Sequence, residues 1–191
     1  MPKSIKIEKE KIVQTAFEMV KAQGEGVLNA RSLAKALNCS TQPIFSNFSS
    51  MDEIKREVII RAENLYDEYT AKEMQRTDIP SYKSSGMAYI RFAREEKELF
   101  KLLFMRDRTH EIIPPMEILK PIVDIIIKAT GISEEQAYLL HLEMWIFVHG
   151  IATMVATAYL PWDENTVSSM LTDVYQGVKE RFLKGEKNDC D

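Results

Sequence analysis

Cysteine and histidine are both scarce in this sequence, and their scarcity excludes several kinds of protein. Of 191 residues only two are cysteine, Cys39 and Cys190, which stand far apart. Their number and spacing argue against a disulfide framework and favour a reducing cytoplasm as the location. Three histidines supply few groups for acid–base catalysis or metal binding. We therefore expect a cytoplasmic protein that carries no cofactor and no structural metal.

Tracts of low complexity and apolar targeting segments are missing as well. The chain has seven glycines and seven prolines, and 45% of its residues are hydrophobic, which is the composition of an ordinary globular protein. The N-terminus alternates lysine with glutamate instead of forming the apolar core of a signal peptide, and no unbroken run of about 18 apolar residues is present. We expect a soluble protein without a membrane contact, built as one domain or as two small domains that share a helix.

The chain as a whole has no excess of positive charge, because its formal net charge is −4. That value argues against nucleic-acid binding, but the charge is unevenly distributed. The first 60 residues hold nine lysines and arginines against seven acidic residues, a net of +2, whereas the rest hold sixteen against twenty-two, a net of −6. The N-terminal end is therefore the basic end of the chain.

Helical periodicity is present along most of the sequence. Residues 8–23 place Val13, Phe17 and Val20 on one face and are followed by Gly24, a typical C-cap. No segment alternates convincingly in the manner of a strand. The sequence therefore predicts an all-α fold. The expected helices cover about 8–23, 29–38, 40–48, 51–74, 89–103, 121–131, 133–160 and 163–183, with a linker over 77–85.

Capping residues indicate where several of these helices begin. A Ser, Asn or Asp side chain before a helix accepts a hydrogen bond from a free backbone N–H. In a capping box, a Glu or Gln three residues later bonds back to the capping residue. The expected caps are Asn29, Ser40 and Asp163, and the expected capping boxes are Ser50 with Glu53 and Ser133 with Gln136.

The stretch "SLAKALNCSTQPIFSNFSSMDEI", residues 32–54, has two short helices joined by about three residues, as in a helix-turn-helix. The second helix of that motif enters the DNA major groove. With Ser40 as N-cap, Pro43 lies in the first turn, where it sacrifices no helical bond and stiffens the end that meets the bases. Thr41 and Gln42 are then exposed and can bond base edges. Two capped helices in an ordinary bundle are the alternative. The side expected to be buried consists of Ile44, Phe45 and Phe48.

The opening helix contains "IVQTAFEMVKAQG", and it is followed by "LNARSLAKALNCSTQPIFSNFSSMDEI". Over residues 7–60 this order resembles the TetR family, the tetracycline-repressor-like transcriptional regulators. The resemblance implies an N-terminal helix-turn-helix DNA-binding domain over 1–50 and a helical effector-binding and dimerisation domain over 51–191. Position by position, it implies contacts to base edges or to the phosphate backbone by Arg31, Ser40, Thr41, Gln42, Pro43, Phe45, Ser46 and Asn47.

Three positions depart from the pattern of that family. Phe45 stands where tyrosine is usual, so a hydroxyl contact to phosphate is lost. Met51 stands where lysine commonly opens the fourth helix, and Asn47 replaces an aromatic residue or histidine. Fewer charged contacts predict a shallower salt dependence of DNA binding than is typical. The lysines that could supply the missing charge are Lys3, Lys6, Lys9 and Lys11.

The motifs "YIRFAREEKELFKLLF", residues 89–104, and "MWIFVHGIATMVA", residues 144–156, lie in the second part of the chain. They resemble a TetR subgroup named for a Trp, His, Gly (WHG) signature, which implies a four-helix dimer interface made by the last two helices of each subunit. The apolar face of the final helix and the small residues before it favour the same interface, and closure of a monomer core is the alternative. The expected interface residues are Gly150, Ala152, Ala156, Val167, Met170, Leu171, Val174 and Val178.

An effector cavity is a further expectation for the second part. Glu96, alone in an apolar stripe, is either a polar anchor in the cavity or the partner of a nearby arginine. Trp145 and His149 either line the cavity or are satisfied core or interface residues, and with His141 they supply too few ligands for a metal. The phenylalanines and methionines fit a core first and a cavity second. The expected lining is Glu96, Phe100, Phe104, Met105, Met116, Trp145 and His149.

These features together predict a DNA-binding transcriptional regulator. We expect a homodimeric repressor that binds a palindromic double-stranded DNA operator and is released by a small-molecule effector. The sequence lacks a nucleophile elbow, a glycine-rich phosphate loop and an HExxH motif, so no enzyme signature is present. A helical adaptor that binds protein through its N-terminal domain and a small helical enzyme are the alternatives. Cys39, in the turn, is expected to pack rather than to act as a redox switch.

Overall fold

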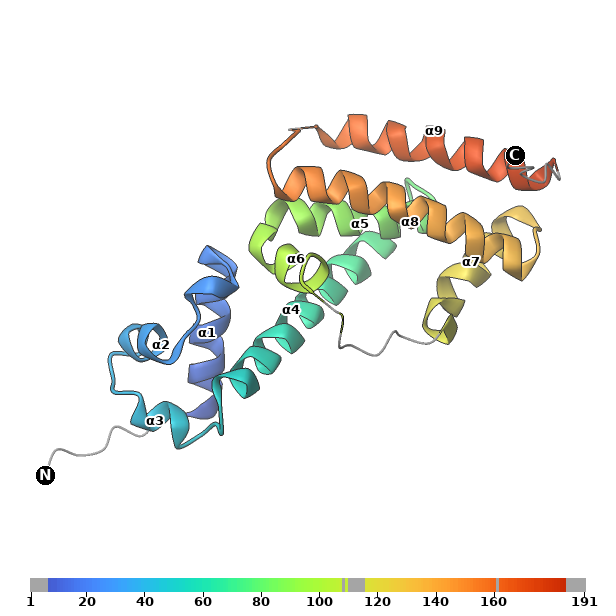
Figure 1. Ribbon diagram of the computed structural model, residues 1–191. Helices are drawn as coiled ribbons and strands as arrows, with labels where there is room; N and C mark the ends of the chain where they lie inside the picture. The colour runs from blue at the N-terminus through green and yellow to red at the C-terminus, as the bar shows by residue number, and fades with distance from the viewer. Residues whose placement is uncertain (1–6, 108, 110–115, 161, 185–191) are drawn as a thin grey trace, which may run out of the picture. The chain divides into compact units, whose positions relative to one another are not determined.

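The computed structural model describes residues 7–107, 109, 116–160 and 162–184. Every regular element within these residues is a helix (Figure 1), so the expected all-α fold is confirmed. The chain forms two compact units. The first unit ends at Glu68, inside a helix, and also contains Glu95–Asp107; the second unit begins at Tyr69 and contains the remaining described residues. The expected division at residue 50 differs from this one because a single helix contributes to both units.

Both units can be followed by their elements in Figure 1. The first unit contains α1 (Lys9–Gln23), the 3₁₀ turn η1 (Glu25–Val27), α2 (Ala30–Ala36), α3 (Gln42–Phe45), most of α4 (Met51–Met74) and α6 (Lys97–Phe104). The second unit contains the end of α4, nearly all of α5 (Ser81–Glu95), the 3₁₀ turn η2 (Met116–Leu119), α7 (Lys120–Thr130), α8 (Glu134–Ala156) and α9 (Glu164–Leu183).

The first unit packs α6 against the C-terminal end of α1. Gly24 ends α1 with a φ of 84°, and a β-carbon at this position would lie 2.6 Å from an Oε of Glu98. Only glycine combines that backbone conformation with so close an approach. Lys21, one turn earlier, pairs with Glu96 at 2.8 Å. The end of α1 is therefore fixed to α6 by both backbone proximity and an ion pair.

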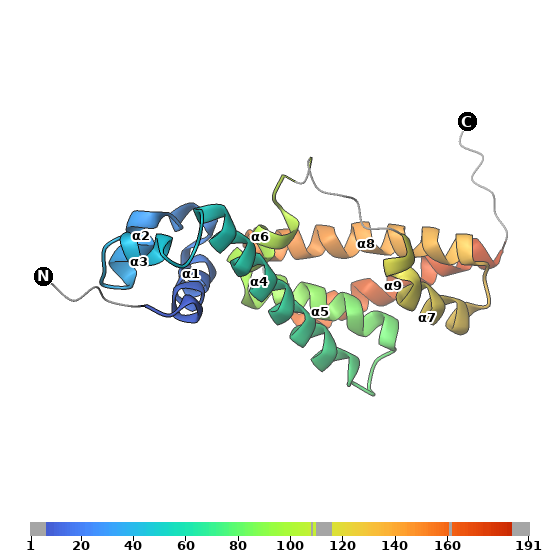
Figure 2. The same ribbon diagram turned by 90° about the horizontal axis from the view of Figure 1, so that it is seen from below.

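The second unit is built around three helices. α8 and α9 run side by side (Figure 1; Figure 2), and α5 packs on both. Gly86 of α5 marks the closest approach, because a β-carbon there would lie 3.3 Å from Val148 of α8 and 3.7 Å from Leu171 of α9. The absence of a side chain on Gly86 thus lets the three helices share one apolar core.

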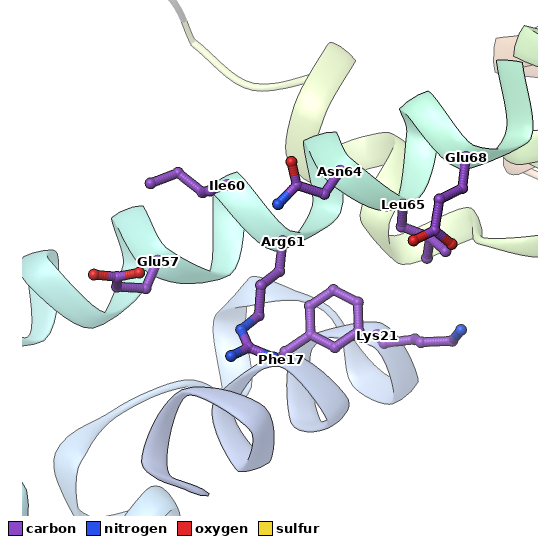
Figure 3. A pocket seen from close by; sticks show the side chains of 8 residues that line it. All are labelled: Phe17, Lys21, Glu57, Ile60, Arg61, Asn64, Leu65 and Glu68. Carbon is purple, nitrogen blue, oxygen red and sulfur yellow. The ribbon is translucent and has the colours of Figure 1, made fainter. Parts of the chain in front are cut away.

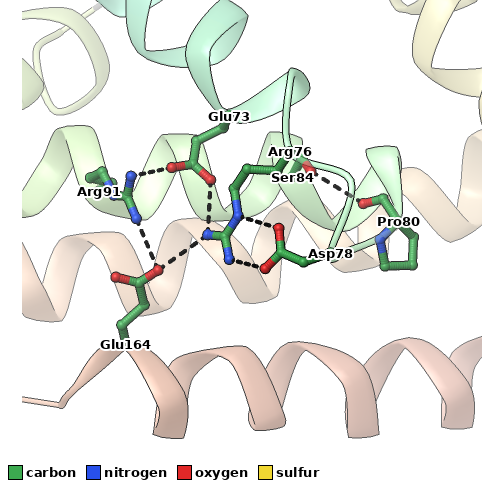
Figure 4. Close-up of polar contacts among 7 residues, drawn as sticks. All are labelled: Glu73, Arg76, Asp78, Pro80, Ser84, Arg91 and Glu164. Atoms are coloured by element: carbon green, nitrogen blue, oxygen red, sulfur yellow. Dashed lines mark hydrogen bonds and ion pairs between the residues drawn. The ribbon is translucent and has the colours of Figure 1, made fainter.

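A buried carboxylate joins three elements of the second unit (Figure 4). Glu73, at the end of α4, is 1% exposed and pairs with Arg91 of α5 and with Arg76 at 3.3 Å. Both arginines also reach Glu164 at the start of α9, at 3.3 and 2.9 Å. Hydrogen bonds from Arg76 lower the pKa of Asp78 to about 2. Two guanidinium groups thus offset the cost of burying Glu73, an arrangement that helical periodicity did not reveal.

Expected and observed helix ends differ at two places near α5. The expected fifth helix is interrupted at Glu96, whose φ of −119° and ψ of 52° separate α5 from α6. The apolar stripe hid this break because it continues on both helices. The expected linker over 77–85 is too long, because α5 begins at Ser81, where the preceding Pro80 carbonyl accepts the Ser84 N–H at 3.0 Å.

The end of α8 also differs from its expected position. The helix stops at Ala156 and not near residue 160, because Ala158 adopts a left-handed conformation with a φ of 56°. The N–H groups of Ala158 and Tyr159 bond back to the carbonyls of Val155 and Met154, at 3.1 and 2.9 Å. This pair of bonds is a Schellman motif, which usually requires glycine and therefore left no signal in the sequence.

α8 is long and apolar enough to be compared with a membrane span. A window of 18 residues in this helix has a mean hydropathy of 1.5. The window is not an unbroken apolar run, so the sequence criterion did not detect it. The core helix of a globular protein gives the same result, and α8 packs on both α7 and α9 with 39% of the window buried. Part of its apolar surface nevertheless faces outward.

Candidate nucleic-acid interface

The helix-turn-helix is held by a capped helix and a tight turn. The Asn29 side chain accepts the Ser32 N–H at 3.0 Å, and the Ser32 hydroxyl accepts the Asn29 N–H at 3.1 Å, which gives α2 a capping box. α2 ends at Ala36, and Asn38, two residues later, has a left-handed φ of 52°. The N–H groups of Asn38 and Cys39 bond back to carbonyls of α2, at 3.1 and 3.0 Å. The turn before α3 is therefore fixed by backbone bonds.

The start of α3 lies one residue later than expected. The N-cap is Thr41, whose carbonyl accepts the N–H groups of Ile44 and Phe45 at 3.2 Å each, and no side chain caps the helix. The prediction that Ser40 is the N-cap was therefore wrong. Ser40 is exposed in the turn before the helix. Pro43 lies in the first turn, as expected, where its missing N–H leaves no bond unmade.

One side of α3 is buried and the other faces outward. Ile44 and Phe48 are 0% and 2% exposed, which fixes the orientation of the helix. The expected burial of Phe45 was wrong, because this side chain is 47% exposed. Neighbouring residues on a helix point about 100° apart, and in this short helix the burial of Ile44 and Phe48 turns Phe45 outward. Gln42 and Ser46 are exposed together with Phe45.

The other residues expected to contact DNA differ in how exposed their side chains are and in whether these side chains already bond within the fold. Arg31 is exposed in the first turn of α2, and Thr41 and Pro43 are half-exposed. Asn47 is half-buried, and its amide donates to the carbonyls of Pro43 at 2.8 Å and of Ile7 at 3.1 Å. The Asn47 amide nitrogen is therefore used within the fold, where it fastens α3 to the segment before α1.

The charge beside α3 comes from neighbouring elements, because residues 38–50 contain no charged side chain. Lys9 of α1 lies 4.7 Å from the centre of the Phe48 ring and pairs with Glu53 of α4 at 3.4 Å. Lys9 is thus partly neutralised by an acid. Lys3 and Lys6, expected to add positive charge, lie outside the described residues.

The start of α4 is capped in a modified way. The Ser50 hydroxyl accepts the Glu53 N–H at 3.3 Å, as expected. The return bond goes to Ser49, whose N–H and hydroxyl both donate to the Glu53 carboxylate, at 2.8 and 2.9 Å. These bonds lower the pKa of Glu53. Met51 is half-exposed as the first residue of α4.

The residues expected to line an effector pocket belong partly to the first unit. Glu96 pairs with Lys21 of α1. Phe100 is fully buried, and its ring centre lies 5.3 Å from that of Phe104. Met105 is exposed at the end of α6. Phe100 is therefore a core residue, whereas Phe104 is half-buried, with its ring centre 5.4 Å from that of Tyr66 in α4.

Trp145 and His149 lie on α8 in the second unit. Trp145 is 48% exposed, and its ring stacks on that of His149 with centroids 5.5 Å apart. The hydroxyl groups of Tyr89 and Tyr82 lie 2.9 and 3.2 Å from ring nitrogens of His149 and His141. Burial lowers the pKa of both histidines. Among the described residues, no three His, Cys, Asp or Glu side chains gather as a metal site would require.

A groove of about 480 Å³ lies between α1 and α4 in the first unit (Figure 3). Its side chains mix apolar and charged groups, and Arg61 is held by Glu10 at 2.5 Å and by Gln14 at 2.6 Å. The lining includes none of Glu96, Phe100, Phe104, Met105, Trp145 and His149, which were expected in the effector pocket. Met116, also expected there, opens η2 in the second unit. The lining residues are Phe17, Lys21, Glu57, Ile60, Arg61, Asn64, Leu65 and Glu68.

The residues expected at a dimer interface divide between the core and the surface. Four of them are buried within the single chain and so cannot contact a second copy without opening the core: Ala152, Ala156, Val167 and Leu171. The half-exposed members are Gly150, Met170, Val174 and Val178. The exposed apolar residues of α8 are Leu139, Trp145, Ile146 and Met154, and of these the sequence analysis singled out Trp145 alone.

Comparison with known proteins identifies the architecture. Residues 83–174 match the family model described as "Tetracyclin repressor-like, C-terminal domain". The solved structure of a TetR-like transcriptional regulator from Rhodococcus sp. RHA1 covers 97% of this chain and 100% of its own, with a TM-score of 0.66 and 12% identity. The fold is that of the TetR-like regulators. No curated protein matches the chain.

Two further solved structures share this TetR-like fold. A TetR family member from Streptomyces coelicolor A3 covers 87% of this chain and 96% of its own, with a TM-score of 0.56 and 16% identity. A TetR variant from Acinetobacter baumannii AYE, in complex with minocycline, covers 94% and 98%, with a TM-score of 0.52 and 15% identity. Residues 83–174 thus match a tetracycline-repressor-like C-terminal domain, and the chain shares the fold of the TetR-like structures.

Proposed function

We propose that this protein is a DNA-binding transcriptional repressor that binds a palindromic operator as a homodimer and is released by a small-molecule effector. The outward end of α3 carries the proposal. Gln42 is exposed and Thr41 half-exposed there, while Ile44 on the opposite side is fully buried and fixes the helix. Neutral polar side chains at the rigid N-terminal end of a recognition helix suit the donors and acceptors of the major groove.

Contacts to the phosphate backbone come from the residues around this end. The exposed Arg31 guanidinium of α2 and the exposed hydroxyls of Ser40 and Ser46 can all donate to phosphate oxygens. Few of these donors are charged, and Lys9 is shared with Glu53. Binding should therefore depend on salt less steeply than is usual for a regulator of this size.

The exposed apolar side of α8 supports homodimerisation. Ile146 is 66% exposed, and a second copy would remove this side chain from water. The half-exposed Val174 and Val178 of α9 could extend the same face. A two-fold dimer that reads DNA holds its recognition helices about 34–36 Å apart, one turn of the double helix, and so selects a palindrome.

Release by an effector is proposed by analogy and from one feature of α8. The TetR variant from Acinetobacter baumannii AYE, which shares the fold, is in complex with minocycline. In this chain the stacked rings of Trp145 and His149, followed by Gly150, keep the spacing of the WHG signature and offer an aromatic surface to a ligand. An effector that prefers a conformer with misplaced recognition helices would reduce DNA binding by no more than its preference for that conformer.

The proposal is tested by selecting bound fragments from genomic DNA and measuring affinity for the selected sequence and for a scrambled duplex. Thr41→Ala and Gln42→Ala should each weaken operator binding by about 1–3 kcal/mol and leave binding to scrambled DNA nearly unchanged. Ser169→Ala, at an exposed position on α9, is the control and should change neither affinity. An equal loss on both duplexes would limit α3 to backbone contacts, and failure to select any sequence would contradict the proposed function.

A further inference from the structure

We propose that Phe45 reads thymine, by packing its ring against the thymine C5-methyl group in each half of the operator. The inference rests on the proposed function, because it assumes that α3 enters the major groove. It assigns to Phe45 a role in sequence specificity, where a tyrosine at the same place could instead bond a phosphate. It also predicts that each operator half-site contains a thymine at one defined position.

The orientation of Phe45 is the first support for this inference. Its side chain is 47% exposed, while the adjacent Ile44 is fully buried. Three residues apart on a helix, Gln42 and Phe45 lie on neighbouring parts of the same face, and both are exposed. The Asn47 amide bonds to the Pro43 carbonyl at 2.8 Å and so holds this short helix in place. Any groove that accepts Gln42 therefore also meets the Phe45 ring.

The chemistry of the ring is the second support. A phenyl group has no hydrogen-bond donor or acceptor, so it cannot bond a phosphate oxygen or the polar edge of a base. Among the four bases, only thymine presents an apolar group in the major groove, its C5-methyl, and phenylalanine is one of the side chains that contact it. Contact with that methyl group would remove apolar surface of both partners from water.

The composition around the ring is the third support. Residues 38–50 contain no arginine or lysine, which are the usual partners of guanine. Gln42 is suited to adenine, whose N6 and N7 it can bond with both ends of its amide. Reading adenine with Gln42 and thymine with Phe45 would make α3 a reader of A·T base pairs.

Replacing thymine by uracil tests the inference, because it removes only the methyl group and keeps the base pair. An operator is first selected from a duplex library with a randomised core, and each thymine is then replaced singly by uracil. For the wild-type protein, one position should be sensitive, and so should its symmetry mate in the other half-site. Single replacement at either should weaken binding about fourfold, which is the value of one buried methyl group. At that position Phe45→Ala should bind the thymine and uracil duplexes equally.

Two further variants separate this role from a general effect on the fold. Phe45→Leu keeps an apolar side chain and should retain a preference for thymine over uracil. Ile60→Ala removes another exposed apolar residue of the first unit, 49% exposed on α4, and should keep the full fourfold effect. The inference is overturned if no uracil weakens wild-type binding, or if Phe45→Ala stays as sensitive as the wild type at every position. Selection of no operator at all would instead overturn the proposed function on which it rests.

Discussion

At the scale of single residues, two turns of the backbone require a left-handed conformation from a residue other than glycine. Asn38, with a φ of 52°, lies in the turn after α2, and Ala158, with a φ of 56°, lies in the turn after α8. Asparagine tolerates this conformation because its short polar side chain can bond locally, whereas alanine gains nothing to offset the steric cost. Asn38 was therefore readable as a helix end, and Ala158 was not.

Ala158→Gly should raise the free energy of unfolding by about 1 kcal/mol, because glycine adopts the left-handed conformation without the clash of a β-carbon. Urea denaturation measures this gain: the midpoint should rise, while the slope of the unfolding free energy against urea concentration stays the same. Gly131→Ala is the reverse control: Gly131 ends α7 with a φ of 75°, and a β-carbon there would meet nothing within 4 Å. It should lose a similar amount from backbone strain alone. A loss of stability in Ala158→Gly would contradict the assigned strain.

At the scale of elements, α5 is joined to α8 by two pairs of tyrosine and histidine. Tyr82 contacts His141, and Tyr89 contacts His149 about two helical turns further along. Residue numbers rise together in these pairs, so the two helices run parallel. Burial raises the pKa of Tyr82 and lowers the pKa of both histidines, so neutral side chains form this contact near pH 7.

The stability of the protein should fall as the pH drops below about 6.5, the value at which histidine in an unfolded chain takes up a proton. The folded chain binds that proton less readily because burial lowers the pKa of His141, so the free energy of unfolding decreases between the unfolded pKa and the lower folded one. Denaturation of His141→Gln should show a shallower decrease over this range, with Gln still able to bond Tyr82. Between pH 7.5 and 8.5 the pH dependences of the two proteins should coincide, and identical slopes below pH 6.5 would exclude His141 as the cause.

The buried carboxylate of Glu73 supports a second element-scale prediction. Glu73→Gln removes the charge that pairs with Arg76 and Arg91 but keeps the shape of the side chain. Both arginines remain near Glu164, so the loss of unfolding free energy should be about 1–3 kcal/mol.

The matched control for Glu73→Gln is Glu180→Gln. Glu180 pairs with Lys184 at 3.2 Å in an exposed pair on α9, where such pairs contribute little. Denaturation should detect a change below about 0.5 kcal/mol for this control. An equally small change for Glu73→Gln would mean that the buried pair contributes no more than a surface pair.

Features that depend on neighbouring residues could be predicted from the sequence, whereas features that depend on distant residues could not. The caps of α2, α8 and α9 were correctly predicted because a capping side chain acts within three residues of its own helix. The ion pair of Glu96 with Lys21 was missed because it joins residues far apart in the chain. The Glu73 network escaped detection for the same reason, since its members come from three elements.

At the scale of the whole molecule, the expected dimer gives the clearest prediction. Ile146→Glu places a charge on the exposed apolar side of α8, where a second copy would have to bury it without a partner. Light scattering should show a monomer with unchanged helix content, because the side chain is not part of the core of one chain. Ile60→Glu makes the same change at an exposed isoleucine of the first unit and should remain dimeric. A dimer in both variants would require another interface.

The candidate DNA-binding site was predictable in its position more than in its details. The order of helices and the proline in the first turn correctly predicted the short helix α3, which we propose as the recognition helix. The directions of individual side chains followed from tertiary packing: Ile44 was correctly assigned to the core, whereas Phe45 faces outward and Asn47 bonds within the fold. The effector pocket could not be located in this way, because Glu96 and Trp145 belong to different compact units.

The continuity of α4 through the boundary between the two units has a consequence for protein engineering. Glu68 and Tyr69 are consecutive residues inside one helix, so no flexible linker is available at this crossing between the units. An exchange of the first unit with that of a relative must also transfer Glu95–Asp107. Each residue inserted into a helix rotates everything beyond it by about 100° and advances it by about 1.5 Å. A chimera joined within α4 must therefore conserve helical phase, and an insertion of about seven residues, close to two full turns, disturbs the phase far less than an insertion of one or two.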